Sequence, residues 1–391
     1  MAIKDIKDNQ VTEDKTKNPK DMDSLDKFVS RTQPIGSIER AIGNNLYGIN
    51  HRRVKGVLPQ NKDEQGYLFF TRPQLNLTNE NVRNYRKMIP LLNTNADSVH
   101  RYVRCLLDPR LHYNNITTPH LDHDMVFMPI LTNTLKNNSG WPDVVNTSFI
   151  SRSGIRREQF AMVDGHVDIL ESFDLDCTFS NVRDEPTTLI MDTWLHYMSA
   201  VFEGRLNPYM DFITENEIDY NTRIYRLILT ENKKYVKKIA CTGAAYPLNL
   251  PTGRFFDYSE ERPYTDQTKD ISIRFKCLGA IYNDDIIVKW FNEAVGIFNS
   301  EMRTLNESCN DKLKRGAIFD RDDPNKGLAT GSLEKIPDRL LLLLNFRGYP
   351  RINPITMELE WWASKKDVDT LEKEFKVKVM EDELNPKKAT T

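Results

Sequence analysis

The strongest constraint on the fold is a stretch in the middle of the chain, residues 172–180, in which apolar and polar residues alternate without a break. A period of two predicts a half-buried β-strand, because successive side chains of a strand point to opposite faces of the sheet. Residues 271–277 repeat the pattern, so we expect both strands in one amphipathic sheet. The apolar positions of the first stretch are Phe173, Leu175, Cys177 and Phe179.

The chain around this stretch predicts an order of elements. From 159 to 299 it reads strand, strand, helix, strand, strand, strand and helix. Pro186 at the first turn of a periodic apolar pattern predicts a helix over 186–202. Asp284 or Asp285 is the expected N-cap of the last helix. Strands and helices mixed in this way predict an α+β fold.

The composition along the chain predicts four regions. Residues 1–60 are polar and carry many Gly and Pro, which predicts an extended or disordered arm, because such a segment buries too little surface to offset its ordering entropy. We expect a small α+β region over 61–150, the central β-domain over 151–300, and a linker with a C-terminal β-hairpin region over 301–391.

Three segments are expected to lack regular structure. Residues 244–253 carry two Pro and a Gly and predict a loop. Residues 300–338 are charged with few large apolar residues, which predicts a linker or a surface excursion. Residues 348–350 are expected to form the turn of the C-terminal hairpin, whose second strand carries Trp361 and Trp362.

Overall charge argues against several classes of partner. The formal net charge is −2, from 54 basic and 56 acidic residues, so the chain has no general attraction for nucleic acid or for a membrane. The longest apolar run, 340–344, is far too short to cross a bilayer, and the N-terminus lacks a signal-peptide core. Five dispersed cysteines without a CxxC pair predict reduced thiols, most of them in the core.

One cluster could carry chemistry. His120 and His123, with Asp122 or Asp124, could donate two imidazoles and a carboxylate to a divalent metal. The alternative is a hydrogen-bonded surface turn, which the preceding Pro119 favours. The sequence has no phosphate-binding glycine loop, nucleophile elbow or zincin helix, so no cofactor and no enzyme activity are expected.

The central domain resembles the tail-tube fold of contractile-tailed bacteriophages and related injection machines. The resemblance covers roughly 145–300 and rests on three motifs in order. Residues 174–182 form an amphipathic strand that leads into a helix with Trp194, residues 245–249 read Ala-Tyr-Pro-Leu-Asn, and residues 270–275 form a last alternating strand. It implies a central tail-tube-like antiparallel β-barrel or sandwich with flanking helices, to which the residue patterns add an N-terminal α+β extension and a C-terminal β-hairpin region.

The resemblance also implies an architectural function. A plain tube subunit is little more than the central domain, so this longer chain is expected to be a tube initiator or baseplate hub subunit of the virion tail, assembled in the host cytoplasm without a membrane. Its expected partners are further copies of itself in a hexameric ring, together with tail tube, baseplate or sheath proteins. DNA would pass through the lumen without specific binding, along a wall that includes Glu171, Asp174 and Asp176 and whose carboxylates would repel the phosphate backbone.

Three alternatives remain open on the sequence. A neck or tail-terminator ring would need the same edge pairing of sheets. A metal-dependent hydrolase would use His120, His123 and a carboxylate, and it predicts bound zinc or manganese. A host-directed binding module would display Trp361 and Trp362 as an exposed patch.

Overall fold

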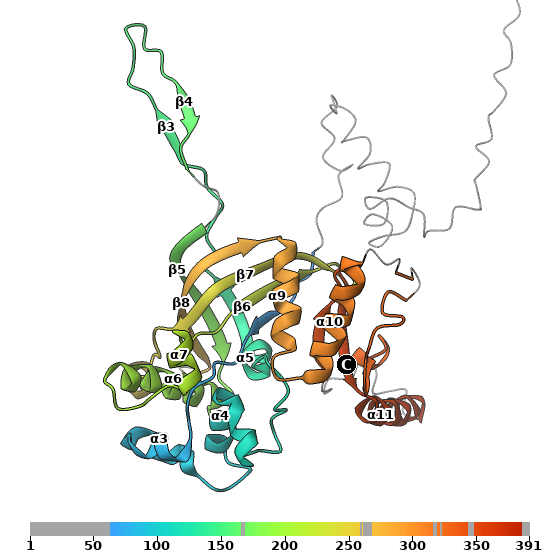
Figure 1. Ribbon diagram of the computed structural model, residues 1–391. Coiled ribbons are helices and arrows are strands. Elements are labelled where there is room, and N and C mark those ends of the chain that lie inside the picture. Colours follow the sequence, from blue (N-terminus) through green and yellow to red (C-terminus); the bar gives the residue numbers. More distant parts are fainter. Residues whose placement is uncertain are drawn as a thin grey trace, which may run out of the picture.

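The computed structural model of the chain describes residues 63–165, 169–258, 260, 268–315, 319–320, 323–342 and 348–384. In these ranges the chain has the expected α+β fold, with helices arranged around one curled antiparallel sheet (Figure 1). The arm predicted over 1–60 lies outside the described residues and stays a prediction.

A six-stranded antiparallel sheet organises the fold, with strand order β1–β6–β7–β8–β5–β2. In the register of β5 with β8 from Phe173 to Ser180, apolar residues oppose apolar ones and polar residues oppose polar ones, as the two alternating stretches predict. The six strands, in spatial order, are β1 (Leu68–Phe70), β6 (Ile224–Leu229), β7 (Val236–Pro247), β8 (Asp270–Tyr282), β5 (Ile169–Ser180) and β2 (Leu135–Ser139).

The sheet is curled into a half-barrel. The ring centroids of Phe70 on β1 and Phe179 on β5 lie 5.9 Å apart, although strands four places apart in a flat sheet would be separated by roughly 19 Å. Helix α5 (Pro129–Thr134) starts beside β1 and runs directly into β2 at the other edge. Its length of roughly 9 Å is therefore enough to bridge the two edges of the curled sheet.

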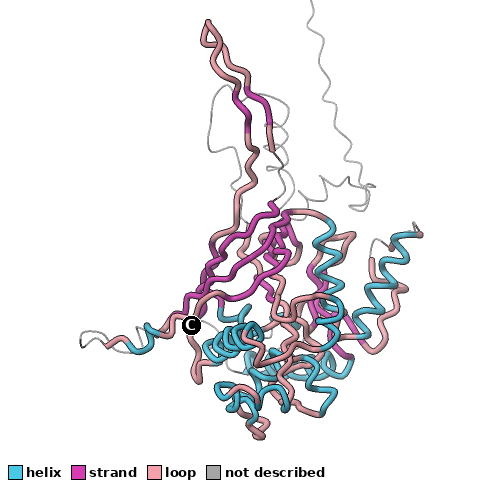
Figure 2. Tube along the Cα trace, turned by 60° about the vertical axis from the view of Figure 1, so that its left-hand side comes forward, coloured by secondary structure: helices cyan, strands magenta, loops and turns pink. Residues whose placement is uncertain are grey.

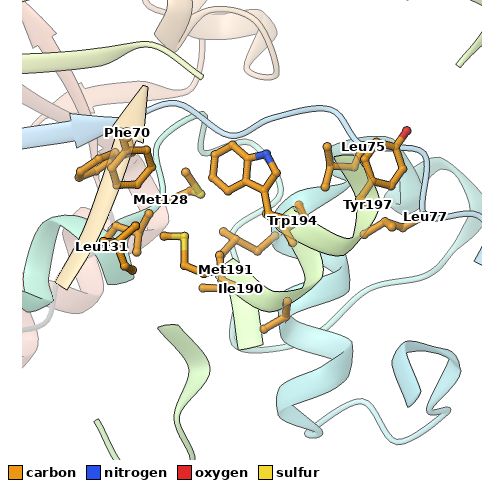
Figure 3. Close-up of a cluster of buried hydrophobic side chains, with 14 of the residues drawn as sticks. Phe70, Leu75, Leu77, Met128, Leu131, Ile190, Met191, Trp194 and Tyr197 are labelled. Carbon is orange, nitrogen blue, oxygen red and sulfur yellow. The ribbon is translucent and has the colours of Figure 1, made fainter. Parts of the chain in front are cut away.

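Helix α6 (Pro186–Phe202) packs into the concave side of the half-barrel and was predicted with these same bounds. Figure 3 shows Trp194 of this helix between Met128, on the side of Phe70, and Leu75. The Trp194 side chain is fully buried, and its Nε1–H donates to the carbonyl oxygen of Tyr220 at 3.0 Å. The indole thus contributes both apolar area and a satisfied hydrogen bond to this core.

Short helices from the N-terminal part extend the concave core below α6 (Figure 1). A buried arginine, Arg72, ties them to β1, because its guanidinium donates to the carbonyl oxygens of Cys105 (2.7 Å), Leu106 (2.8 Å) and Met125 (2.9 Å). The first two carbonyls lie in the last turn of α4, where an arginine satisfies oxygens that the helix leaves unpaired. These helices are α3 (Asn79–Arg83), η3 (Arg86–Leu92), α4 (Val99–Leu107) and η4 (Pro109–Asn114).

A second core covers the convex side of β1, β6 and β7. Helix α9 (Asp285–Val295) packs there through Ile287, Val288, Phe291 and Val295. The side chain of Asp284 accepts a hydrogen bond from the backbone of Ile286 at 2.9 Å, which confirms this residue as the N-cap. Behind α9 lie α10 (Ser300–Lys314), a small sheet of β9 (Leu333–Lys335), β10 (Tyr349–Ile352) and β11 (Leu359–Ser364), and helix α11 (Lys365–Leu384).

The element order predicted for 159–299 is confirmed as β4, β5, α6, β6, β7, β8 and α9. Two further short helices are described there, α7 (Met210–Glu215) after α6 and η5 (Gly253–Phe256) between β7 and β8. All five cysteines are free and buried, as predicted. Another short helix in the described ranges is η6 (Leu340–Leu342).

The linker predicted over 300–338 is wrong for its first part, which forms helix α10. The side chain of Asn299 caps this helix, and its buried residues Met302, Leu305 and Cys309 recur at helical spacing between charged positions. A narrow apolar stripe is enough to hold a helix whose remaining faces are solvated.

Two other loop predictions are wrong. Residues 244–247 continue β7 rather than starting a loop, because Pro247 stands at the end of the strand, where a missing N–H costs little. Residues 349 and 350 belong to β10 and not to a turn. Trp362 is buried in the second core, which confirms that this aromatic pair serves packing and removes the displayed Trp361–Trp362 patch on which a host-directed module would depend.

The expected division of the chain at residue 150 falls in hairpin β3–β4, and the large sheet takes strands from both sides of that position. Strands β1 and β2 come from the expected α+β region over 61–150, and the other four come from 151–300. The proposed regions therefore share one sheet.

Candidate assembly interface

Strands β5 and β8 expose a ladder of polar side chains on the convex face of the sheet. Lys276 Nζ donates to Asp174 Oδ1 at 2.8 Å, and Arg274 Nε donates to Asp176 Oδ1 at 3.0 Å. The next row pairs the hydroxyls of Thr178 and Ser272, whose oxygens lie 3.3 Å apart. Directly opposite residues on antiparallel strands are close enough to pair, so the register of the two strands determines this pattern.

Asp174 and Asp176 thus lie on the exposed polar face where the alternation places them, and each faces a cation from β8. The expectation that this face is acidic and repels phosphate is therefore wrong, because the ladder carries mixed charge. Glu171 is also exposed, but the register of β5 shifts between Ile169 and Ser172, so its face does not follow from the alternation. The assignment of these three carboxylates to a channel wall stays a proposal.

The structure directs the members of the histidine cluster toward different partners. His120 Nε2 lies 3.4 Å from Asp97 Oδ1. The His123 ring stacks on His112 with 5.8 Å between centroids, and Asp122 accepts a hydrogen bond from the Tyr349 hydroxyl at 2.9 Å. Within the part of the chain that the structure describes, no group of three or more His, Cys, Asp or Glu side chains is arranged to hold a metal ion.

A hairpin formed by β3 (Ser148–Ile150) and β4 (Ala161–Val163) projects from one end of the sheet, away from the helices, in both views (Figures 1 and 2). Its strands pair only with each other among the described strands. Towards its tip, the N–H of Gly154 donates to the Glu158 carbonyl oxygen at 2.9 Å. More than half of each of its large apolar side chains is exposed: Phe149, Ile150, Ile155, Phe160, Met162 and Val163.

The sequence predicted a strand where β4 lies, but not its partner β3 or the hairpin that the two strands form. Its strands are three residues each, and the segment between them, 151–160, has no two-residue turn signature. The available signals were Phe149-Ile150 and the run 160–163, two short apolar segments that flank a polar, glycine-containing stretch.

The two edges of the large sheet differ in availability. The outer edge of β1 is occupied, because the N–H of Arg72 donates to the Val126 carbonyl oxygen at 2.8 Å and the N–H of Met128 donates to the Phe70 carbonyl oxygen at 2.9 Å. β2 has no second strand neighbour among the described residues. A neighbouring strand could therefore pair with β2 but would have to displace chain from β1.

Residues 6–377 match a family model whose description is "Putative phage tail tube protein". The chain belongs to this tail tube family. Because the match spans nearly the whole sequence, the segments on both sides of the central β-domain are part of what the family shares. The protein is thus a structural component of a phage tail and not an enzyme.

Two solved structures align with part of this tail tube protein. The anti-feeding prophage cap, a tube terminating cap, is 12% identical over 40% of this chain and 82% of its own, with a TM-score of 0.26. The sheath/tube terminator of the extracellular contractile injection system PVC, in its extended state, is 10% identical over 41% of this chain and 88% of its own, with a TM-score of 0.24. A comparison with curated proteins found no match.

No helix in the described ranges is both long and apolar enough to span a membrane.

Proposed function

We propose that copies of this tail tube protein close into a ring that continues the DNA channel at the start of the tail tube, beside the baseplate hub. The observation that carries this proposal is the projecting hairpin β3–β4. An isolated two-stranded hairpin is at best marginally stable in water. A hairpin that also exposes six large apolar side chains is expected to be stabilised by another polypeptide.

For a member of the tail tube family, the expected partner of the hairpin is a second copy of the same chain. A tube is built by repetition of one subunit, and heterologous contacts between identical chains generate rings when the rotation closes. The number six is the one that the resemblance implies. The open edge of β2 offers a second contact to the neighbouring copy.

The polar ladder of β5 and β8 is the part of the surface that we assign to the channel wall. Its charges are paired across the strands, so the wall offers a passing phosphate backbone neither a free cation to bind nor a net negative charge to repel. Binding to DNA depends on cations that replace the condensed counterions of the phosphates. A wall whose cations are already paired would let DNA slide.

The segments that flank the central β-domain, which the family model also covers, supply a surface for the neighbours expected at the tube start. Helices α9, α10 and α11 and the β9–β11 sheet cover one side of the half-barrel and give the chain a broad outer surface. We expect sheath, baseplate or neighbouring-ring proteins to contact this surface.

Electron microscopy of the purified protein, with light scattering for mass, tests the ring. Rings with a central hole are expected at high protein concentration, and a matched variant that lacks residues 148–163 should stay monomeric while it keeps the unfolding temperature of the full chain. A wild-type protein that remains monomeric at every concentration, also when mixed with assembled tail tube or baseplate, would exclude the proposed ring.

A further inference from the structure

The tip of the hairpin is basic as well as apolar. Between β3 and β4 the chain carries three arginines and one glutamate, and all four are exposed. Ile155, at the tip, is fully exposed. A surface of this kind suits a partner that offers both an apolar patch and carboxylates. The charged residues are Arg152, Arg156, Arg157 and Glu158.

Such a surface lies at the other end of the same molecule, on α7 and the turn that follows it. Met210 and Ile213 are three residues apart on the exposed face of this helix, and Ile218 follows, each more than half exposed. Glu215 and Glu217 are exposed among them, and the segment from 211 to 219 contains no lysine or arginine.

Helix α7 is held in place through its opposite face. Phe212 is buried, and the guanidinium of Arg110 lies over the rings of Phe212 (5.2 Å) and Tyr209 (4.8 Å). Arg110 Nη1 also pairs with Asp211 Oδ2 at 2.8 Å. The anchoring cation therefore neutralises Asp211 and leaves Glu215 and Glu217 to face outward.

The two surfaces cannot meet within one copy. The hairpin leads into the first residue of β5, whereas α6 and α7 follow its last residue, and the twelve residues of β5 span roughly 40 Å. Figure 1 shows the hairpin and α7 at opposite ends of the sheet, with the hairpin pointing away. Any contact between them must join two molecules.

We propose that the hairpin tip of one copy docks on α7 of the next copy, head to tail, with Arg156 and Arg157 facing Glu215 and Glu217 around an apolar centre. This inference rests on the proposed function, because it names the contact through which the copies assemble. The contact uses two different surfaces of the same chain, so each copy offers one free hairpin and one free α7, and the contact repeats along the assembly.

A charge-reversal experiment tests this contact. The variant Arg156→Glu/Arg157→Glu and the variant Glu215→Arg/Glu217→Arg should each self-associate about tenfold more weakly than the wild type in sedimentation velocity. An equimolar mixture of the two should assemble like the wild type, since each hairpin then meets an α7 of opposite charge. Restoration by mixing also proves that both variants fold.

The control is Asp369→Arg/Glu374→Arg on the exposed side of α11, which makes the same change in charge as Glu215→Arg/Glu217→Arg away from both surfaces and should assemble normally. If the wild type does not assemble at all, the proposed function fails. If the wild type assembles and the variants do so equally well, or if mixing restores nothing, this docking contact is wrong and the ring proposal stands.

Discussion

The two halves of the sheet are covered differently. Strands β1, β6 and β7 are buried on both faces: Phe70 and Ile224 point into the concave core, while Phe69, Tyr225 and Leu227 point into the convex core under α9. Strands β5 and β8 are buried on the concave face alone, and their convex face is the exposed ladder of ion pairs.

This difference separates scaffold from surface. Burial on both faces leaves the first half few solvent-facing side chains, such as Lys238 of β7, so most of its residues serve stability. The convex positions of β5 and β8 carry charged residues that contribute little to folding stability, because exposed ion pairs are weak. The polar convex face of β5 and β8 is therefore the part of the sheet that remains available for assembly or for the channel wall.

The largest effect is expected in the doubly covered half. Phe291 of α9 is fully buried, and its ring lies 5.0 Å from that of Phe127 and 5.3 Å from that of Tyr225, centroid to centroid. Replacing Phe291 by Ala should lower the free energy of unfolding by about 4 kcal/mol, measured by chemical denaturation, because it leaves a cavity in the convex core. The same substitution at Phe202, which is 93% exposed at the end of α6, is the control and should change it by less than about 0.5 kcal/mol.

A similar loss of stability is expected where β10 and β11 are held against α10, on the convex side of the sheet. Arg351 of β10 is fully buried, and it donates to Glu360 Oε2 at 2.9 Å and to Asn306 Oδ1 of α10 at 3.0 Å. Arg351→Met should cost about 4 kcal/mol, since it removes the closer cation of the buried Glu360 carboxylate and leaves only Lys335 Nζ, 3.4 Å from Oε1. Adding Glu360→Gln should recover part of that loss in the same denaturation experiment. A double variant no more stable than the single one would mean that packing of the Arg351 side chain, and not its charge, holds these elements together.

The concave side contains a titratable group that should make stability depend on pH. The Asp108 carboxylate accepts hydrogen bonds from Leu77 N (2.8 Å), Arg110 N (3.1 Å) and the Tyr209 hydroxyl (2.7 Å). Burial is the main cause that raises its pKa from an ordinary 3.8 to about 6. The folded chain therefore binds this proton more tightly than the unfolded chain does.

The contribution of Asp108 to the free energy of unfolding is fully present below about pH 4, where the carboxyl group is protonated in both states. It is lost as the pH rises to about 6, by about 3 kcal/mol for a pKa shift of this size. The variant Asp108→Asn cannot titrate at this position. The difference in free energy of unfolding between wild type and variant should therefore drift in favour of the variant between pH 4 and 6. Parallel curves for the two proteins across that window would show that the carboxyl group titrates normally.

The sequence predicted the sheet well where its pattern was local. The alternation over 172–180 and 271–277 identified β5, β8 and the exposed positions of Asp174 and Asp176, because a strand's two faces follow from its own period. The cations opposite them depend on which residues of β8 come into register, and one strand alone does not determine that. The mixed charge of the ladder was therefore missed, although both halves of it were in the sequence.

Other features depend on contacts between distant segments. The pairing of residues 126–128 with β1 brings together chain about 55 residues apart, and α5 links the two edges that the curl of the sheet brings close. Helix α10 was missed because its charged residues outnumber the three buried apolar residues, Met302, Leu305 and Cys309, that hold it against the core. The hairpin was missed because its two short apolar segments carry little periodic signal. Tertiary contacts decide such segments, and local preference does not.

The smallest effect on stability, and the sharpest test of the free face, is expected from Asp174→Lys/Asp176→Lys. All four charged side chains of the ladder are at least one-third exposed, so the unfolding temperature should change little and rings should still form. Each new cation would face Lys276 or Arg274 and leave four unpaired positive charges in two adjacent rows. The assembled variant should then retain duplex DNA, with affinity that falls steeply as salt is added, and DNA ejection should slow.

The control for this variant makes the same change in charge on α11, with Asp369→Lys/Glu374→Lys. Only the ladder variant should slow ejection if the β5–β8 face lines the channel, because DNA in the lumen never reaches α11. Equal retention of DNA by both variants would mean that total charge governs binding and that the ladder faces elsewhere. Unchanged ejection by the ladder variant would place the exposed face on the outside of the ring, where its paired charges would serve contacts with sheath or baseplate.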